Sequence, residues 1–240
     1  NIEDFKESKR QKEFKEREDN VFVNKEKPSR SLNIALREYA PGATLVIDGR
    51  AYRSEGIVIK DFTNPGNNDD IHFAVAWRCE KCGTTGVREN AYANSRDLCC
   101  SNPQCRALIP EREKVSTLRP TGFLTDFWKP TSNDILTQKF IPVAEPRVSL
   151  VGEQVTLPNK DCGFVRFGHN GQIFHHTKGE YGYGFAVCLA CGRAASMTAA
   201  DTIPSELDVL KDHRPLGGAV AGDFKESCSG GHVKSNIALG

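Results

Sequence analysis

The sequence has few of the features of a large hydrophobic domain. It contains one Met and two Trp in 240 residues, and only 38% of its residues are hydrophobic. No apolar stretch approaches the roughly 20 residues that a membrane-spanning helix needs, so we expect no membrane partner. The 32 basic and 31 acidic side chains nearly cancel and leave a formal net charge of +1. Any binding to nucleic acid must therefore come from local basic patches.

Common catalytic motifs are also missing. The sequence holds no G-x-x-x-x-G-K-[ST] loop for nucleotide phosphates and no H-E-x-x-H pair for a catalytic zinc. No serine triad or pair of carboxylates stands out. These absences argue against catalysis by this chain.

The first 30 residues mix charges of both signs and have no continuous apolar stripe. We interpret residues 1–30 as a solvated arm or linker rather than a signal peptide. The chain starts at Asn1 and ends at Gly240 directly after an apolar pair, and we expect it to be a piece of a larger polypeptide. Without a secretory signal, nine cysteines indicate a reducing, cytoplasmic setting, where thiols bind metal more often than they form disulfides.

The cysteines form two sets with the spacing of metal ligands. In the first set, Cys79 and Cys82 belong to a C-x-x-C-G turn, and Cys100 and Cys105 follow in a C-x4-C turn. Two such pairs can complete a tetrahedral zinc site. Cys99 competes with Cys100, which we prefer because its turn closes more tightly.

The second set begins with another C-x-x-C-G turn at Cys188 and Cys191, and Cys228 is the expected third ligand. Three residues are candidates for the fourth ligand: His213, His232 and Cys162. We choose His213, which lies on a polar loop from which an imidazole can reach inward. Together the two sets predict about two zinc ions per chain, each held by four protein ligands that leave no open position for a catalytic water.

The surrounding pattern predicts an α+β fold, in a strand-rich and loop-rich module with two zinc-ribbon-like sites. Residues 31–39 form a short amphipathic helix, and Asp48-Gly49 is the turn of a hairpin over residues 44–53. We expect another strand over Gly56–Lys60, an alternating strand over Ile71–Trp77, and a helix over Ile203–Leu210.

We divide the chain into three parts. The arm covers residues 1–30, the hairpin and first zinc-ribbon-like module cover residues 31–135, and a second zinc-binding module covers residues 136–240. The hairpin carries Arg50, Tyr52 and Arg53, a pairing of basic and aromatic side chains that can hold a nucleic-acid strand. An ordinary solvated surface is an equally good interpretation of these three residues. Strand alternation puts Arg50 and Tyr52 on one face and Arg53 on the other.

Several segments, in their order, resemble a known family. They are Arg30–Gly42, Val46–Gly49 with Tyr52, the Cys79 turn, Pro120–Phe127, Gly184–Gly192, and Cys228–Gly240. The set resembles the region that follows the motor of certain superfamily 2 DEAD/DEAH-box helicases, a C-terminal zinc-binding region called MrfA-like or MZB. That region occurs in repair helicases and in phage-defence proteins such as DrmB of the DISARM system and the Druantia helicase.

The resemblance implies a non-catalytic zinc-binding accessory module of a DNA helicase or translocase, in phage defence or DNA repair. Such a module would dock on a superfamily 2 helicase motor, in cis or in trans, and help guide DNA. The motor motifs are absent, so ATPase activity does not carry over to this chain. The alternative is a structural scaffold that joins a helicase to partner proteins without touching DNA. A zinc nuclease is disfavoured because no carboxylate cluster is present.

Overall fold

The computed structural model describes seven stretches of the chain. They are residues 28–59, 73–89, 97–126, 129–150, 152–169, 171–216 and 227–240. Residues 1–27 of the expected arm, and residues 71 and 72 of the strand expected before Cys79, lie outside these stretches. Internal contacts divide the chain into two units, Asn1–Ser31 and Leu32–Gly240, and all the helices and strands of the described stretches belong to the second unit.

A short helix opens this unit, as the sequence predicts. Helix α2 spans Leu32–Glu38 and buries Ala35 and Leu36, which lie on one face. Leu36 belongs to a core cluster that also contains Phe185 and Ile237 from distant strands. The helix is therefore held mainly by its apolar face, as expected for one too short to be stable alone.

The predicted hairpin follows the helix. Strands β1 (Thr44–Ile47) and β2 (Arg50–Ile57) pair antiparallel, and β2 pairs on its other side with β6 (Phe123–Thr125). Both turn residues have positive φ, 50° at Asp48 and 71° at Gly49, which is the geometry whose twist suits a two-residue hairpin loop.

The separate strand expected over Gly56–Lys60 is wrong for Gly56–Ile59, and Lys60 lies outside the described residues. Strand β2 continues without a break through Gly56 to Ile57, because a bulge between Ser54 and Gly56 lets its pairing with β6 continue. Gly56 also lies against another backbone: a Cβ placed there would be 2.3 Å from the carbonyl oxygen of Gly192. The glycine is needed for this close approach and does not begin a new strand.

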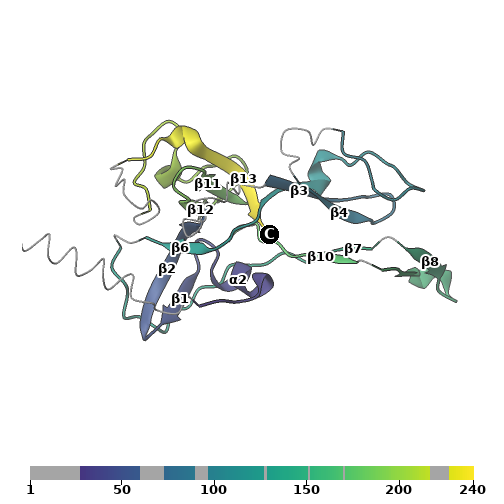
Figure 1. Ribbon diagram of the computed structural model, residues 1–240, viewed down its shortest axis with the longest axis horizontal. Coiled ribbons are helices and arrows are strands. Elements are labelled where there is room, and N and C mark those ends of the chain that lie inside the picture. Colours follow the sequence, from purple (N-terminus) through teal and green to yellow (C-terminus); the bar gives the residue numbers. More distant parts are fainter. Residues whose placement is uncertain are drawn as a thin grey trace, which may run out of the picture. The chain divides into compact units, whose positions relative to one another are not determined.

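A six-stranded sheet forms the centre of the fold (Figure 1). Its strands, in spatial order, are β12 (Ala194–Ser196), β11 (Phe185–Cys188), β13 (Val233–Leu239), β5 (Lys114–Leu118), β3 (Phe73–Arg78) and β4 (Thr85–Glu89). Neighbours are antiparallel except for β13 and β5, which are parallel. Strands from both sides of residue 135 share this sheet, so the two cysteine-rich stretches are joined through one hydrogen-bonded framework.

Four further strands form two two-stranded sheets within residues 147–150, 152–169 and 171–174, which we call the ribbon arm. Strand β7 (Arg147–Ser149) pairs with β10 (Gln172–Phe174), and β8 (Glu153–Thr156) pairs with β9 (Phe164–Phe167). The pairs are nested in sequence, with the one-turn helix η2 (Lys160–Cys162) between β8 and β9. Strands β7, β8 and β10 are labelled in Figure 1.

The remaining regular elements are single 3-10 turns. They are η1 (Glu111–Glu113), η3 (Ser205–Leu207) and η4 (Gly230–His232). The helix expected over Ile203–Leu210 is therefore wrong, since only η3 forms there. Leu207 is buried but Leu210 is 89% exposed, so the segment has no continuous apolar face to support further helical turns.

Candidate metal centres

The two C-x-x-C-G segments form turns with the same backbone geometry. In the first knuckle (Cys79–Gly83), the N–H of Gly83 donates to the carbonyl of Cys79 over 2.8 Å. In the second knuckle (Cys188–Gly192), the N–H of Gly192 donates to the carbonyl of Cys188 over 2.9 Å. Each glycine has positive φ, 70° and 77°, a conformation that costs a residue with a side chain about 1–2 kcal/mol. The glycine thus lets each turn close with both thiols on its inner side.

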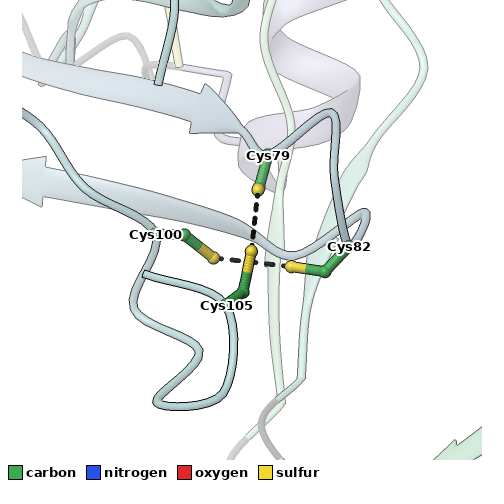
Figure 2. Close-up of side chains that lie close together, drawn as sticks. All are labelled: Cys79, Cys82, Cys100 and Cys105. Atoms are coloured by element: carbon green, nitrogen blue, oxygen red, sulfur yellow. Dashed lines mark hydrogen bonds between the residues drawn. The ribbon is translucent and has the colours of Figure 1, made fainter. Parts of the chain in front are cut away.

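The first centre consists of four thiols that converge from two turns, as Figure 2 shows. The sulfur of Cys79 lies 3.7 Å from that of Cys105, and the sulfur of Cys82 lies 3.5 Å from that of Cys100. All four sulfurs lie within 4.8 Å of one another. A tetrahedral zinc ion with Zn–S bonds of about 2.3 Å would separate its sulfur ligands by about 3.8 Å. The four thiols therefore have the spacing that a tetrahedral metal ion requires.

The second pair of this centre is shaped by Asn102. Its backbone carbonyl accepts from the N–H of Cys105 over 3.0 Å, and its side-chain oxygen accepts from the N–H of Gln104 over 3.0 Å. The N–H of Asn102 points back at the sulfur of Cys100, 3.4 Å away. Cys99 is exposed whereas Cys100 is 4% exposed. The structure therefore brings Cys100 rather than Cys99 to the centre.

The second centre joins the second knuckle to two residues from distant segments. The sulfur of Cys188 lies 3.5 Å from that of Cys228, and the sulfur of Cys191 lies 3.4 Å from Nε2 of His213. His213 and Cys228 exchange two backbone hydrogen bonds of 2.8 Å each, which hold the two ligands side by side. All four ligands are buried.

The structure decides between the candidates for the fourth ligand. His213 is 8% exposed and faces the centre, whereas His232 is exposed in η4. Cys162 is exposed in η2 of the ribbon arm. The eight residues selected from the sequence thus lie together in two groups of four that can each hold a metal ion.

The thiols within each centre differ in pKa. Burial raises the pKa of Cys82, but hydrogen bonds with Thr84 and with neighbouring thiols outweigh it and lower that pKa to about 6. Burial raises the pKa of Cys100 to about 12. In the second centre, the hydrogen bond from Cys191 lowers the pKa of Cys188 to about 4, and the same interaction raises the pKa of Cys191. Crowded thiols stabilise one thiolate at a time, and a bound cation would replace the protons that the others retain.

His213 supports the same interpretation of the second centre. Its Nδ1 is buried and has no hydrogen-bond partner in the part of the chain that the structure describes. Its Nε2 lies 3.4 Å from the sulfur of Cys191, so Nε2 is the ring nitrogen that can bind a metal at this centre.

A buried ionic network lies beside the second centre, and no motif in the sequence indicates it. The side chain of Asp126 is fully buried and accepts from Arg193 over 2.8 Å and from Arg214 over 2.5 Å. Glu55 of β2 adds a second buried carboxylate, 3.7 Å from Arg193 and 2.8 Å from Lys129. Arg193 follows the second knuckle and Arg214 follows His213, so the network fixes both ligand-bearing segments to the β2–β6 sheet.

The residues predicted to contact nucleic acid occupy the start of β2. Arg50 is exposed, Tyr52 is half-buried, and Arg53 is exposed with its Nε 3.4 Å from Glu55. The buried carboxylate partly neutralises Arg53. Arg50 and Tyr52 remain the more available pair for a ligand, and their role stays a prediction.

Comparisons with known proteins found no matching family model, no matching curated protein and no matching solved structure. Within the described stretches, no helix is long and apolar enough to cross a membrane. Assignment of a function therefore depends on the geometry of the two centres.

Proposed function

We propose that each centre binds one structural zinc ion, giving two ions per chain. The support is the donor set, with four thiols in one centre and three thiols with one imidazole in the other. Soft thiolates at tetrahedral spacing select zinc or iron among common metals, and Cys₄ and Cys₃His sets are usual for structural zinc. Four protein ligands per ion leave no position for a reacting water, so both ions act in folding.

The test is metal content in protein purified without chelators. We expect about two zinc ions per chain and no absorption from iron–sulfur charge transfer. Cys105→Ser removes a first-centre ligand and lowers the count to about one. Cys99→Ser is the matched control, because Cys99 is exposed and adjacent to a ligand, and it leaves the count at two. Equal losses from both variants, or iron in place of zinc, would contradict this assignment.

We further propose that the chain is a non-catalytic accessory module of a DNA helicase or translocase in phage defence or DNA repair. It would dock on a superfamily 2 motor and help guide DNA. The order of the segments that resemble the MrfA-like region supports this function. The closed donor sets add support, since they suit a rigid accessory element better than an enzyme.

Affinity capture from cells that encode the full system tests the motor partner. We expect a superfamily 2 helicase to be retained, or to be encoded in the same polypeptide. DNA binding is then measured with and without that motor. If a motor is retained and its affinity for DNA is unchanged by the chain, the guiding role fails while docking stands.

The scaffold alternative rests on a different observation, the exposed apolar side chains of the ribbon arm. Val148 and Ile173 are a cross-strand pair, and they are 56% and 63% exposed. On the outer pair of strands, Phe164 and Phe167 are 50% and 61% exposed. Exposed apolar side chains grouped on one element are typical of protein contacts.

Two sets of variants separate the functions. Phe164→Ser with Phe167→Ser would abolish capture of the motor if the arm is a docking element. Arg50→Ala should weaken DNA binding more than Arg53→Ala, because Glu55 partly neutralises Arg53. Loss of capture with no DNA binding by any form of the chain favours the scaffold.

A further inference from the structure

Cationic side chains converge at the base of the ribbon arm. Strand pairing sets Trp77 of β3 opposite Lys114 of β5, so the next residue, Arg78, lies beside Glu113. Arg147, the first residue of β7, donates from its guanidinium to the backbone carbonyl of Glu113 over 3.3 Å. Arg78 and Arg147 therefore approach the same point from two different strands.

Lys178 lies on a third segment, four residues after the strand partner of Arg147. Phe174 of β10 is the strand partner of Arg147, and Thr177 exchanges backbone hydrogen bonds with Leu239 at the end of β13. Lys178 follows directly and is half-buried. Burial lowers the pKa of Lys178, and the nearby positive charge of Arg147 lowers it further. We call Arg78, Arg147 and Lys178 the basic seam.

The basic seam has more positive charge than the chain neutralises. None of its three residues forms an ion pair with a carboxylate within the described stretches. Glu113 is the acid whose charge acts on both Arg147 and Lys178, and it leaves the seam with a net positive charge. Burial and the charge of Arg78 lower the pKa of Arg147. Partly desolvated cations in mutual repulsion are unfavourable unless an anion joins them.

An aromatic loop begins at the same lysine. The N–H of Gly184 donates to the carbonyl of Lys178 over 2.7 Å and closes a loop that carries Tyr181 and Tyr183. The two tyrosines are 52% and 47% exposed. The acid of this loop, Glu180, is already paired with Lys139 over 2.6 Å, and its N–H donates to Ser196 over 3.1 Å. The loop is thus held in place while its rings face solvent.

We propose that the basic seam and the tyrosine loop form a binding site for single-stranded DNA, with the seam contacting phosphates and the tyrosines stacking on bases. The inference rests on the proposed role in guiding DNA and locates a contact surface for it. Arginine and lysine provide phosphate contacts and exposed rings provide stacking, which is the combination that holds single strands without reading sequence. The hairpin carries the same combination of basic and aromatic residues, but there Arg53 lies 3.4 Å from the carboxylate of Glu55 and is partly neutralised. The hairpin is therefore the weaker candidate for this contact.

The experiment is a fluorescence anisotropy titration of the full chain with a labelled oligothymidine of about 20 nucleotides, at several salt concentrations. The seam variant is Arg147→Gln with Lys178→Gln, and the loop variant is Tyr181→Ser with Tyr183→Ser. The control is Lys211→Gln, which removes a positive charge from an exposed ion pair with Asp208. Metal content and melting temperature check that each variant is folded.

We expect the seam variant to bind at least tenfold more weakly, with a shallower dependence on salt by about 0.7 in log–log slope per lost phosphate contact. The loop variant should bind single strands about 5- to 150-fold more weakly per lost stacked base, with little change in salt slope. The control should differ from the unmodified chain by less than about threefold, since surface charge far from a site is screened.

Other results would contradict either the location of the site or the proposed role in guiding DNA. If the unmodified chain binds DNA and neither the seam nor the loop variant weakens it, the site is wrong while the guiding role stands. If the unmodified chain does not bind even at low salt, the site fails together with the DNA part of the proposed function. If the seam variant does not fold, the loop variant decides, because its side chains face solvent and unchanged binding would refute the site.

Discussion

Gly83 and Gly192 occupy the same position in the two knuckles and differ in what surrounds them. Both have positive φ, so replacing either by Ala costs the same backbone strain of about 1–2 kcal/mol. A Cβ at Gly83 would meet no atom within 4 Å, whereas a Cβ at Gly192 would lie 2.2 Å from the carbonyl oxygen of Ile57. We therefore expect Gly192→Ala to destabilise the chain far more than Gly83→Ala.

The difference between the two substitutions can be estimated from the contact. Relief of the overlap requires the second knuckle to separate from β2 by about 1 Å, since ordinary contacts begin near 3.4 Å. A hydrogen bond from the N–H of Ile57 to the carbonyl of Gly192, 2.8 Å long, joins the two backbones at this point. Its loss costs about 1 kcal/mol, and overpacking adds about 1–3 kcal/mol. The excess for Gly192→Ala is thus about 2–4 kcal/mol.

Thermal unfolding at saturating zinc measures this excess. For a chain of this size each kcal/mol lowers the melting temperature by about 2–4 °C, so Gly192→Ala should melt roughly 10 °C below Gly83→Ala. Zinc content determined in parallel shows whether both centres remain loaded. Equal melting temperatures would show that the second knuckle does not press on β2, and would refute the close approach of the two backbones.

Three further outcomes are expected. His213→Ala should lower the metal count from two to one while His232→Ala leaves it at two, and the reverse result would show that the second centre is assembled differently. Asp126→Asn should destabilise the chain by about 2–3 kcal/mol in urea unfolding, because it removes the carboxylate that Arg193 and Arg214 share and leaves buried Arg193 only the longer contact with Glu55, and a cost below about 1 kcal/mol would mean that the network is solvated. Burial, with nearby positive charges, lowers the pKa of His176 from 6.5 to about 4, so the unfolded chain takes up this proton first. The stability that neutral His176 provides is therefore complete above about pH 6.5 and is lost as the pH falls toward 4. His176→Gln should remove about 2 kcal/mol of the acid-induced loss between about pH 7 and 5, and an unchanged acid dependence would contradict this assignment.

Short-range signals in the sequence determined much of the local structure. Asp48-Gly49 was sufficient to predict the hairpin, because a two-residue turn with positive φ is decided by the residues within it. The C-x-x-C-G spacing likewise indicated two metal-binding turns, since ligands three residues apart share one turn. The strand that enters Cys79 was predicted from alternation, although Ala76 on the opposite face is buried as well as Val75 and Trp77.

The wrong predictions concern residues whose structure depends on contacts with segments that are distant in the sequence. Gly56 was expected to start a strand, but its real constraint is the backbone of Gly192, which no pattern near residue 56 can reveal. Strand β13, near the end of the chain, lies between β11 and β5 in the central sheet, so its position depends on partners far away in sequence. Pairings of this kind are set by which apolar faces can be buried together.

The sequence alone determined which residue types can bind metal and roughly where they lie, because ligand chemistry and turn geometry are local properties. Only the tertiary structure decided that His213, and not His232 or Cys162, completes the second centre. Two backbone hydrogen bonds with Cys228 place His213 there, and spacing along the chain does not encode them. The basic seam is likewise a product of the fold, since Arg78, Arg147 and Lys178 meet only after three separate segments have packed together.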